Sequence, residues 1–245
     1  MSGIDGLYIT FCRCNDPARE PVWDEWFDTV RLPQLMHTGG WARATRWRLT
    51  VPVASSTDLG FSHMTVLEMD GPDALEKIQR AASSAFVPGL LHSHHAALGA
   101  LALRPVGRWA DTPPLAADAQ SLLFISGRCT DPARDAEWNR WYDDVHIPDV
   151  LSTGGYHAAT RWRLLDPHPA QANDYAIYQS RLQADEAYRT MAEGIPPLYA
   201  QGRRHPLHTA GIRFTLEPAG RYGAAGLPRG QALLVKDPSQ GGVMQ

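Results

Sequence analysis

Three residues in the second half of the chain have the types and the spacing that acid–base chemistry requires. On a helix, residues three and four apart share a face, so we expect Tyr142 and Asp143 to reach the imidazole of His146. Pro148 cannot donate a backbone hydrogen bond and disfavours helical angles at Ile147, so the helix should weaken here and leave carbonyls that favour a cationic His146. This pattern predicts His146 as a general acid–base, Tyr142 as a hydrogen-bond donor and Asp143 as the group that orients His146. The alternative is a structural histidine that caps the helix end.

Arginines at matching positions of two predicted strands are candidates for holding an anionic substrate. Two arginines flank a tryptophan on each strand: Arg46 and Arg48 beside Trp47, and Arg161 and Arg163 beside Trp162. Because strand side chains alternate between faces, the arginines lie on the face opposite the tryptophans. We expect the tryptophans to pack against helices and the arginines to face the space between two sheets, or solvent if the strand is at a sheet edge. Between the sheets a charge needs a carboxylate or an anionic ligand. The alternative is structural ion pairs with Asp28, Asp143 or Glu68. The candidate substrate-binding residues are Arg161, Arg163, Arg128, Tyr175, Arg31, His63, Arg46 and Arg48.

Histidines recur in two clusters that share an H-x-x-H spacing, which zinc sites also use. No cysteine or acidic residue accompanies either cluster, so we predict no metal and no cofactor. The weak metal candidates are His92, His95, His205 and His208. Two further residues, His63 and Tyr175, are expected to occupy matching strand positions and to point into the space between the sheets.

A tandem repeat supplies the elements that must position these residues. Residues 13–49 align without a gap on residues 128–164, and 20 of the 37 positions are identical. The similarity returns at 105–109 and 218–222. We therefore predict a first unit at 1–109, a linker at 110–120, a second unit at 121–222 and a C-terminal tail at 223–245.

Each unit shows the same order of elements. A β-rich strand is followed by an N-capping aspartate, Asp16 or Asp131, and by a helix with apolar residues at i, i+3, i+4 and i+7. A Thr-Gly-Gly sequence ends this helix, and two strands, a second helix and a fourth strand follow. The order β-α-β-β-α-β is that of a ferredoxin-like unit, whose open sheet face needs cover. The predicted fold is thus α+β, with two tandem ferredoxin-like units packed sheet to sheet as a pseudo-dimeric α+β barrel.

The helix around His146 resembles a known family. The run from Trp141 to Leu151 is similar to the W-Y-x-x-x-H-x-P-x-x-L helix of EthD-like proteins, which belong to the dimeric α+β barrel superfamily. The resemblance implies a barrel over residues 6–222 and places His146 at the family's histidine, where the first unit has Arg31. This superfamily includes muconolactone isomerases, cofactor-free monooxygenases and polyketide cyclases. The duplicated ferredoxin-like chain also resembles chlorite dismutase-like haem proteins, which have a similar length, but their haem-binding pattern is not recognisable here.

Composition and charge narrow the class of protein. Hydrophobic residues make up 44% and charged residues 20%, as is usual for globular chains. A net charge of -3 without a basic stripe argues against nucleic acid, and no apolar run is long enough for a membrane span. The three cysteines are too few for a disulfide framework, so we expect the protein to reside in the reducing cytoplasm.

The sequence therefore predicts an enzyme that acts on an aromatic or polyketide-like, anionic small molecule by proton transfer at His146, without an organic cofactor. Lyase, isomerase, cyclase and cofactor-free oxygenase chemistry each fit this pattern. Two alternatives stay open: a non-catalytic protein that binds an aromatic ligand, and a metal- or haem-dependent enzyme. Association of two barrels into a homodimer also stays open.

Overall fold

The computed structural model describes residues 4–50, 59–84, 92–108, 115, 118–167 and 172–223, so most of the expected linker and tail lie outside the described residues. The elements of the first unit are β1 (Ile4–Cys14), η1 (Pro17–Arg19), α1 (Glu20–Trp26), η2 (Phe27–Arg31), α2 (Leu32–Gly39), β2 (Arg43–Leu49), β3 (His63–Asp70), α3 (Ala74–Ser84) and β4 (His95–Arg108). The elements of the second unit are β5 (Ser121–Cys129), η3 (Pro132–Arg134), α4 (Asp135–Trp141), η4 (Tyr142–His146), α5 (Ile147–Ser152), β6 (Ala158–Leu164), β7 (Asp174–Ser180), α6 (Ala184–Leu198), η5 (Tyr199–Arg203) and β8 (His208–Gly223). Both units thus have the predicted order of strands and helices.

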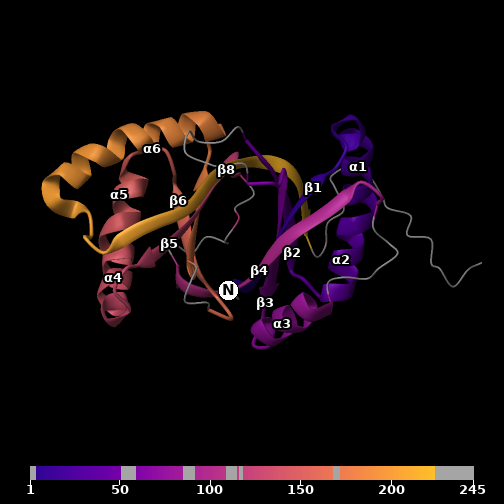
Figure 1. The fold of residues 1–245 in the computed structure, drawn as a ribbon, viewed down its shortest axis with the longest axis horizontal. Helices are drawn as coiled ribbons and strands as arrows, with labels where there is room; N and C mark the ends of the chain where they lie inside the picture. The colour runs from indigo at the N-terminus through magenta and orange to yellow at the C-terminus, as the bar shows by residue number, and fades with distance from the viewer. Residues whose placement is uncertain are drawn as a thin grey trace, which may run out of the picture.

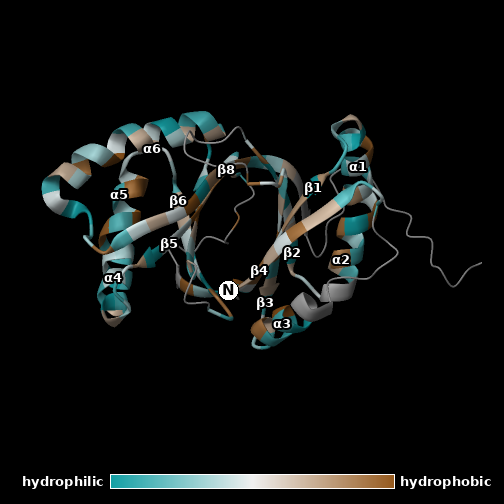
Figure 2. Cartoon of the chain, in the orientation of Figure 1, coloured by the Kyte–Doolittle hydropathy of each residue, from teal (hydrophilic) through white to brown (hydrophobic). Residues whose placement is uncertain are grey.

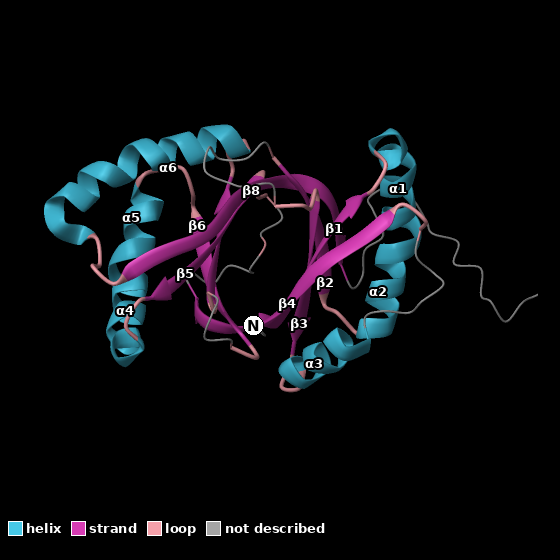
Figure 3. Cartoon of the chain, viewed as in Figure 1, coloured by secondary structure: helices cyan, strands magenta, loops and turns pink. Residues whose placement is uncertain are grey.

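The eight strands form one closed antiparallel barrel in the order β1-β3-β2-β8-β5-β7-β6-β4. Each unit contributes four neighbouring strands, and the two sheets join where β2 pairs with β8 and β4 pairs with β6. The helices of the first unit cover one outer side of the barrel and those of the second unit cover the other (Figures 1 and 3). This arrangement confirms the predicted pseudo-dimeric α+β barrel.

The helices carry both hydrophilic and hydrophobic residues, as elements with one solvent-facing side should (Figure 2). Within the described residues, no helix combines the length and hydropathy that crossing a membrane would require.

Apolar side chains from both sheets fill the interior of the barrel. An eight-stranded barrel is just wide enough for side chains to meet at its axis. Phe124 and Phe214 stack there with ring centroids 5.1 Å apart, and Phe11 packs edge-on against both. The space between the sheets is therefore an apolar core.

The alternation on β2 and β6 is as predicted, but the two faces are exchanged. Trp47 and Trp162 point into the barrel, where each indole donates a hydrogen bond of 2.9 Å to a threonine two residues earlier. The prediction that Arg46, Arg48, Arg161 and Arg163 face the space between the sheets is thus wrong. They share the outer face of their strands, where Arg46 and Arg161 are buried under helices and Arg48 is exposed. The indole nitrogen finds a local acceptor, whereas the guanidinium needs the carboxylates of the helices.

The expected match between His63 and Tyr175 is also wrong, by one residue. His63 lies opposite Arg48 on β2, and Asp174 lies opposite Arg163 on β6, so His63 corresponds to Asp174. A slip of one residue exchanges the faces of a strand. Tyr175 accordingly packs against the barrel core, whereas His63 lies beneath α1.

The helix expected to weaken at Pro148 continues and widens instead. Ile147 keeps helical angles (φ -63°, ψ -49°), and its N–H bonds the carbonyl of Tyr142, five residues earlier, which makes η4 a π-helical turn. Proline cannot donate to the preceding turn and its ring crowds the carbonyl four residues back, so one wider turn accommodates it. The first unit repeats this turn in η2 before Pro33. The aspartate caps are confirmed, since Asp16 and Asp131 each accept a backbone N–H at 3.0 Å.

Candidate functional site

His146 is the last residue of the π-helical turn η4 and lies on the outer side of the second sheet, with only 6% of its surface exposed. The turn brings the ring of Tyr142 against it, with centroids 4.7 Å apart. Asp143 is not brought to the imidazole; its carboxylate instead accepts a hydrogen bond of 2.8 Å from Arg161. The structure thus unites two of the three predicted catalytic residues.

Side chains from three other positions complete the surroundings of His146. Trp141 stacks on the imidazole at 5.0 Å, and His208, the first residue of β8, lies 5.3 Å away. The hydroxyl of Tyr199, from η5, is 3.4 Å from Nδ1 of His146. We call these five residues, Trp141, Tyr142, His146, Tyr199 and His208, the His146 cluster.

The His146 cluster keeps its histidines neutral at physiological pH. Burial lowers the pKa of His146 to about 3, and the neighbouring His208 and Arg161 act in the same direction. Burial likewise lowers the pKa of His208 to about 4 and raises the pKa of Tyr142 to about 12. The expectation of a cationic His146 is therefore wrong, because burial dominates and no carboxylate of the described residues reaches the ring.

The tautomer of His208 is set by a neighbouring tryptophan. Trp138 donates its indole N–H to Nδ1 of His208 at 3.2 Å, so the ring proton of the neutral imidazole is on Nε2. The first unit repeats this bond between Trp23 and His95, at 3.3 Å. Two of the weak metal candidates thus use one ring nitrogen to accept from a tryptophan.

The other two weak metal candidates also have one ring nitrogen engaged. Nδ1 of His205 accepts the backbone N–H of Leu207 at 3.2 Å, and Nδ1 of His92 accepts that of His94 at the same distance. His205 places Nε2 3.3 Å from the carboxylate of Glu137.

The first unit preserves the frame of this cluster but not its proton-carrying groups. Trp26 packs against His95 as Trp141 packs against His208. Phe27 and Arg31 stand where the second unit has Tyr142 and His146. Burial lowers the pKa of Arg31. A neutral base next to a phenol is thus found in the second half of the repeat.

Buried arginines fix the helix of the His146 cluster and the matching helix of the first unit. Arg161 is 1% exposed, bonds Asn139 and Asp143, and places its guanidinium carbon 4.4 Å from the centre of the Tyr142 ring. Arg46 is bound in the same way by Asp24 and Asp28, and covers Phe27 at 4.5 Å. This outcome agrees with the alternative of structural ion pairs with Asp28 and Asp143.

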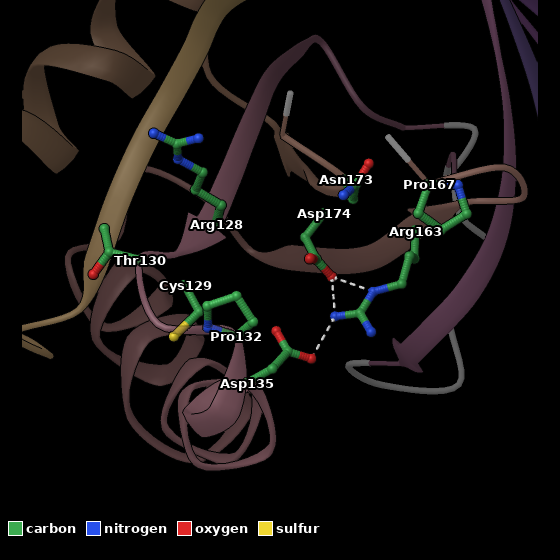
Figure 4. A pocket seen from close by; sticks show the side chains of 9 residues that line it. All are labelled: Arg128, Cys129, Thr130, Pro132, Asp135, Arg163, Pro167, Asn173 and Asp174. Atoms are coloured by element: carbon green, nitrogen blue, oxygen red, sulfur yellow. Dashed lines mark hydrogen bonds and ion pairs between the residues drawn. The ribbon is translucent and has the colours of Figure 1, made fainter. Parts of the chain in front are cut away.

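Two further candidate substrate-binding residues line a cavity of about 570 Å³ at the end of β5. Figure 4 shows Arg163 pointing toward Asp135 and Asp174, which it binds, whereas the guanidinium of Arg128 lies apart from them. None of the cavity's lining residues belongs to the His146 cluster. The predicted arginines are therefore distributed over several places and do not form one anion site.

The sequence reasoning missed Tyr199 and gave His208 no role other than a weak metal candidate. Tyr199 follows Pro196 and Pro197, which lie inside a longer helix than expected, and no motif marks it. His208 was expected before the fourth strand, yet β8 begins with it. The repeated H-x-x-H spacing was a usable signal for His208, because both units place that residue next to a core tryptophan.

Comparison with known proteins gives a likeness in fold. No family model and no curated protein matches the sequence. An anthrone oxidase-like protein superposes with a TM-score of 0.58 at 10% identity, over 92% of this chain and 97% of that one. The chain has a dimeric α+β barrel fold.

Two further barrels of this kind cover nearly the same length. A provisionally assigned monooxygenase of Fusobacterium nucleatum has a TM-score of 0.51 at 8% identity, over 93% of this chain and 98% of that one. A chlorite dismutase variant of Candidatus Nitrospira defluvii has a TM-score of 0.55 at 12% identity, over 89% of this chain and 93% of that one. At such identities the likeness concerns the fold alone, so any chemistry of the barrel must be argued from its own side chains.

The buried His146 makes stability depend on pH. Its pKa is about 3 in the folded chain and 6.5 in an unfolded one, so between these values the unfolded chain binds a proton that the folded chain excludes. The contribution of His146 to the free energy of unfolding therefore has its full value above pH 6.5. Below that pH it decreases by up to about 1.4 kcal/mol per pH unit. We expect His146→Gln to remove this dependence, so that the free energies of unfolding of the two proteins converge by about that amount per unit between roughly pH 6 and 4. Urea denaturation at three pH values measures it, and parallel pH profiles would contradict it.

Proposed function

We propose that this chain is a small-molecule enzyme that uses the His146 cluster to remove a proton from an aromatic substrate. The observation that supports the proposal is the neutral His146, enclosed by two tyrosines, in the half of a repeat whose other half has Arg31 and Phe27 instead. If these residues only stabilised the fold, both units would be expected to keep the same residues at these positions.

The first step assigns each group of the cluster a role. Neutral His146 accepts the proton, and the substrate becomes an enolate or phenolate beside the new imidazolium. Burial disfavours an isolated imidazolium, but the anion formed in the same step offsets this cost because the two charges are adjacent. The hydroxyl of Tyr199 and the Nε2–H of His208 are donors for the developing oxyanion.

The anthrone oxidase-like neighbour favours an anthrone-type substrate. The resemblance to a superfamily that includes cofactor-free monooxygenases favours oxygenation without a cofactor. A methylene between two aromatic rings and opposite a carbonyl is acidic, and its carbanion reacts with O2. Each turnover would convert one CH2 group to a carbonyl, consume one O2 and release one water. Isomerase, lyase or cyclase chemistry would share the same proton abstraction and differ in the fate of the carbanion.

A haem does not fit the cluster. The imidazole of His146 is covered by Trp141, Tyr142 and His208 at ring distances of 4.7–5.3 Å, and Tyr199 occupies its Nδ1 side. A macrocycle whose iron must come within bonding distance of a ring nitrogen would have to displace several of these side chains. An aromatic substrate needs only one C–H group near that nitrogen, and it too must move at least one of them to enter.

Oxygen uptake with anthrone as the substrate tests the proposal. We expect the purified, chelator-treated protein to consume O2 and anthrone in a one-to-one ratio, faster than the same protein after heat denaturation. Saturable binding of anthrone without turnover would favour the non-catalytic alternative. Neither binding nor turnover, with anthrone or with a set of phenols that carry acidic C–H groups, would overturn the proposal.

A further inference from the structure

Glu20, Asp24 and His63 bring three metal-ligating side chains together in the first unit, away from the His146 cluster. Glu20 and Asp24 are one turn apart on α1, and His63 begins β3 beneath that helix. One ligand atom from each residue lies within 4.8 Å of the others. Such an arrangement is a candidate metal site if something besides proximity points to a cation.

The second unit shows that a cation occupies the corresponding place there. The matching residues are Asp135, Asn139 and Asp174, by the repeat alignment and by the strand register. Arg163 inserts its Nη2 between two of them, 3.2 Å from Asp135 and 2.7 Å from Asp174 (Figure 4). Positive charge at this position is thus part of how the second unit is built.

In the first unit the matching arginine does not fill this place. Arg48 has the strand position of Arg163, but it is exposed and forms no ion pair within the described part of the chain. We propose that a divalent transition-metal ion, held by Glu20, Asp24 and His63, occupies in the first unit the position that a guanidinium occupies in the second.

The side chains around this site fit a metal ion in chemistry and in charge. Nδ1 of His63 faces the hydroxyl of Ser62 at 2.9 Å, and Nε2 faces Asp24, 3.6 Å from its Oδ1. One ring nitrogen is therefore held and the other is turned toward the carboxylates, as is usual for a ligating histidine. One imidazole and two carboxylates suit Zn²⁺, Mn²⁺ or Co²⁺ and leave coordination positions for water.

Arg46 binds Asp24 and Asp28 and acts as the outer partner that orients the Asp24 ligand. Three carboxylates, on Glu20, Asp24 and Asp28, and one guanidinium give these four residues a net charge of -2, which a divalent ion neutralises. The nearby Arg46 therefore does not exclude a cation, because its charge is already matched by Asp28.

Calorimetric titration of the chelator-treated full chain with Zn²⁺ tests the site. We expect one ion per chain and an affinity that falls at least about 10-fold in Glu20→Gln, which leaves the ion pairs of Arg46 intact, and about 100-fold in His63→Gln. With Co²⁺ as the probe, we expect a visible absorption band that His63→Gln shifts or removes. The matched control is Glu137→Gln, since Glu137 and His205 form a histidine–carboxylate pair in the second unit without a third ligand; it should bind Zn²⁺ as the wild type does.

Two results would overturn the proposal. One is the absence of saturable binding of Zn²⁺ and Co²⁺ to the wild type. The other is binding that survives in both Glu20→Gln and His63→Gln, which would place the ion elsewhere. Neither result depends on the proposed function of His146, because binding is read without turnover.

Discussion

Replacing His146 with glutamine is expected to lower kcat for oxygenation of the anthrone-type substrate by about 100-fold or more, which is the usual contribution of a general base. Glutamine is close to histidine in size and keeps a polar group beside Tyr199, but it cannot accept the proton. KM should change little, because the aromatic walls of the cluster, Trp141 and Tyr142, remain. The measurement is steady-state oxygen uptake at several substrate concentrations.

Two further variants separate catalysis from folding. His37→Gln, an exposed histidine on α2, makes the same chemical change on the surface and should leave kcat unchanged. Tyr199→Phe removes one donor and should lower kcat by about 5-fold, since a neutral hydrogen bond contributes about 1 kcal/mol. Activity of His146→Gln within a factor of two of the wild type would remove the proposed role of His146.

The barrel could be predicted because the repeat fixes its parts. Twenty identities over 37 positions identify two copies of one unit, and the order of elements in that unit restricts how its open sheet face can be covered. The existence and order of the strands follow from local composition, whereas β8 extends beyond the expected strand and begins at His208. Neither inference depends on whether a given strand face packs against the barrel interior or against the helices.

The faces of β2 and β6 could not be predicted in the same way. An alternation of Trp and Arg shows that the two types lie on opposite faces, but not which face meets the barrel interior. The decision depends on carboxylates outside the strands, such as Asp28 for Arg46, because each tryptophan finds its acceptor on its own strand. These contacts join residues that are distant in the sequence and come together only in the folded barrel.

The candidate site was predictable in its helix and not in its surroundings. Tyr142 and His146 are one turn apart on a single helix, so their contact followed from spacing. Asp143 was assigned to His146 by the same spacing, yet the buried Arg161 attracts its carboxylate more strongly. Tyr199 and His208 come from elements 50 or more positions away along the chain, and the widened turn that sets the direction of His146 has no established sequence signal.

Replacing Arg161 with methionine is expected to lower the free energy of unfolding by about 3 kcal/mol, the lower end of the cost of removing one partner of a buried ion pair, because Asp174 keeps Arg163. The side chain is 2% exposed. Its nearer partner Asp143 is 35% exposed, whereas Asp174, 3.9 Å away and 10% exposed, loses one of the two guanidinium groups that face it. Without the guanidinium, Asp143 and Asn139 lose their bonds, and the ring of Tyr142 loses the cation that covers it. Methionine fills much of the volume but offers no charge.

The matched variant in the first unit, Arg46→Met, should cost less, about 1–3 kcal/mol, although Arg46 is equally buried. Its carboxylate partners, Asp24 and Asp28, are 36% and 29% exposed, so water solvates them once the guanidinium is gone. The size of the loss is thus set by the burial of the acid that stays behind rather than by that of the arginine.

A double variant distinguishes this explanation from a simple loss of packing. If the buried Asp174 carries the cost, then Asp174→Asn should recover about 1–2 kcal/mol of the loss caused by Arg161→Met. The same Asp174→Asn change in the wild-type background should destabilise, because Arg161 and Arg163 both face that carboxylate. Urea denaturation of the four proteins at pH 7 gives the interaction energy. Additive losses, with no recovery in the double variant, would mean that Arg161 stabilises the barrel through its contacts with the rings of Tyr142 and Trp138 rather than through its charge.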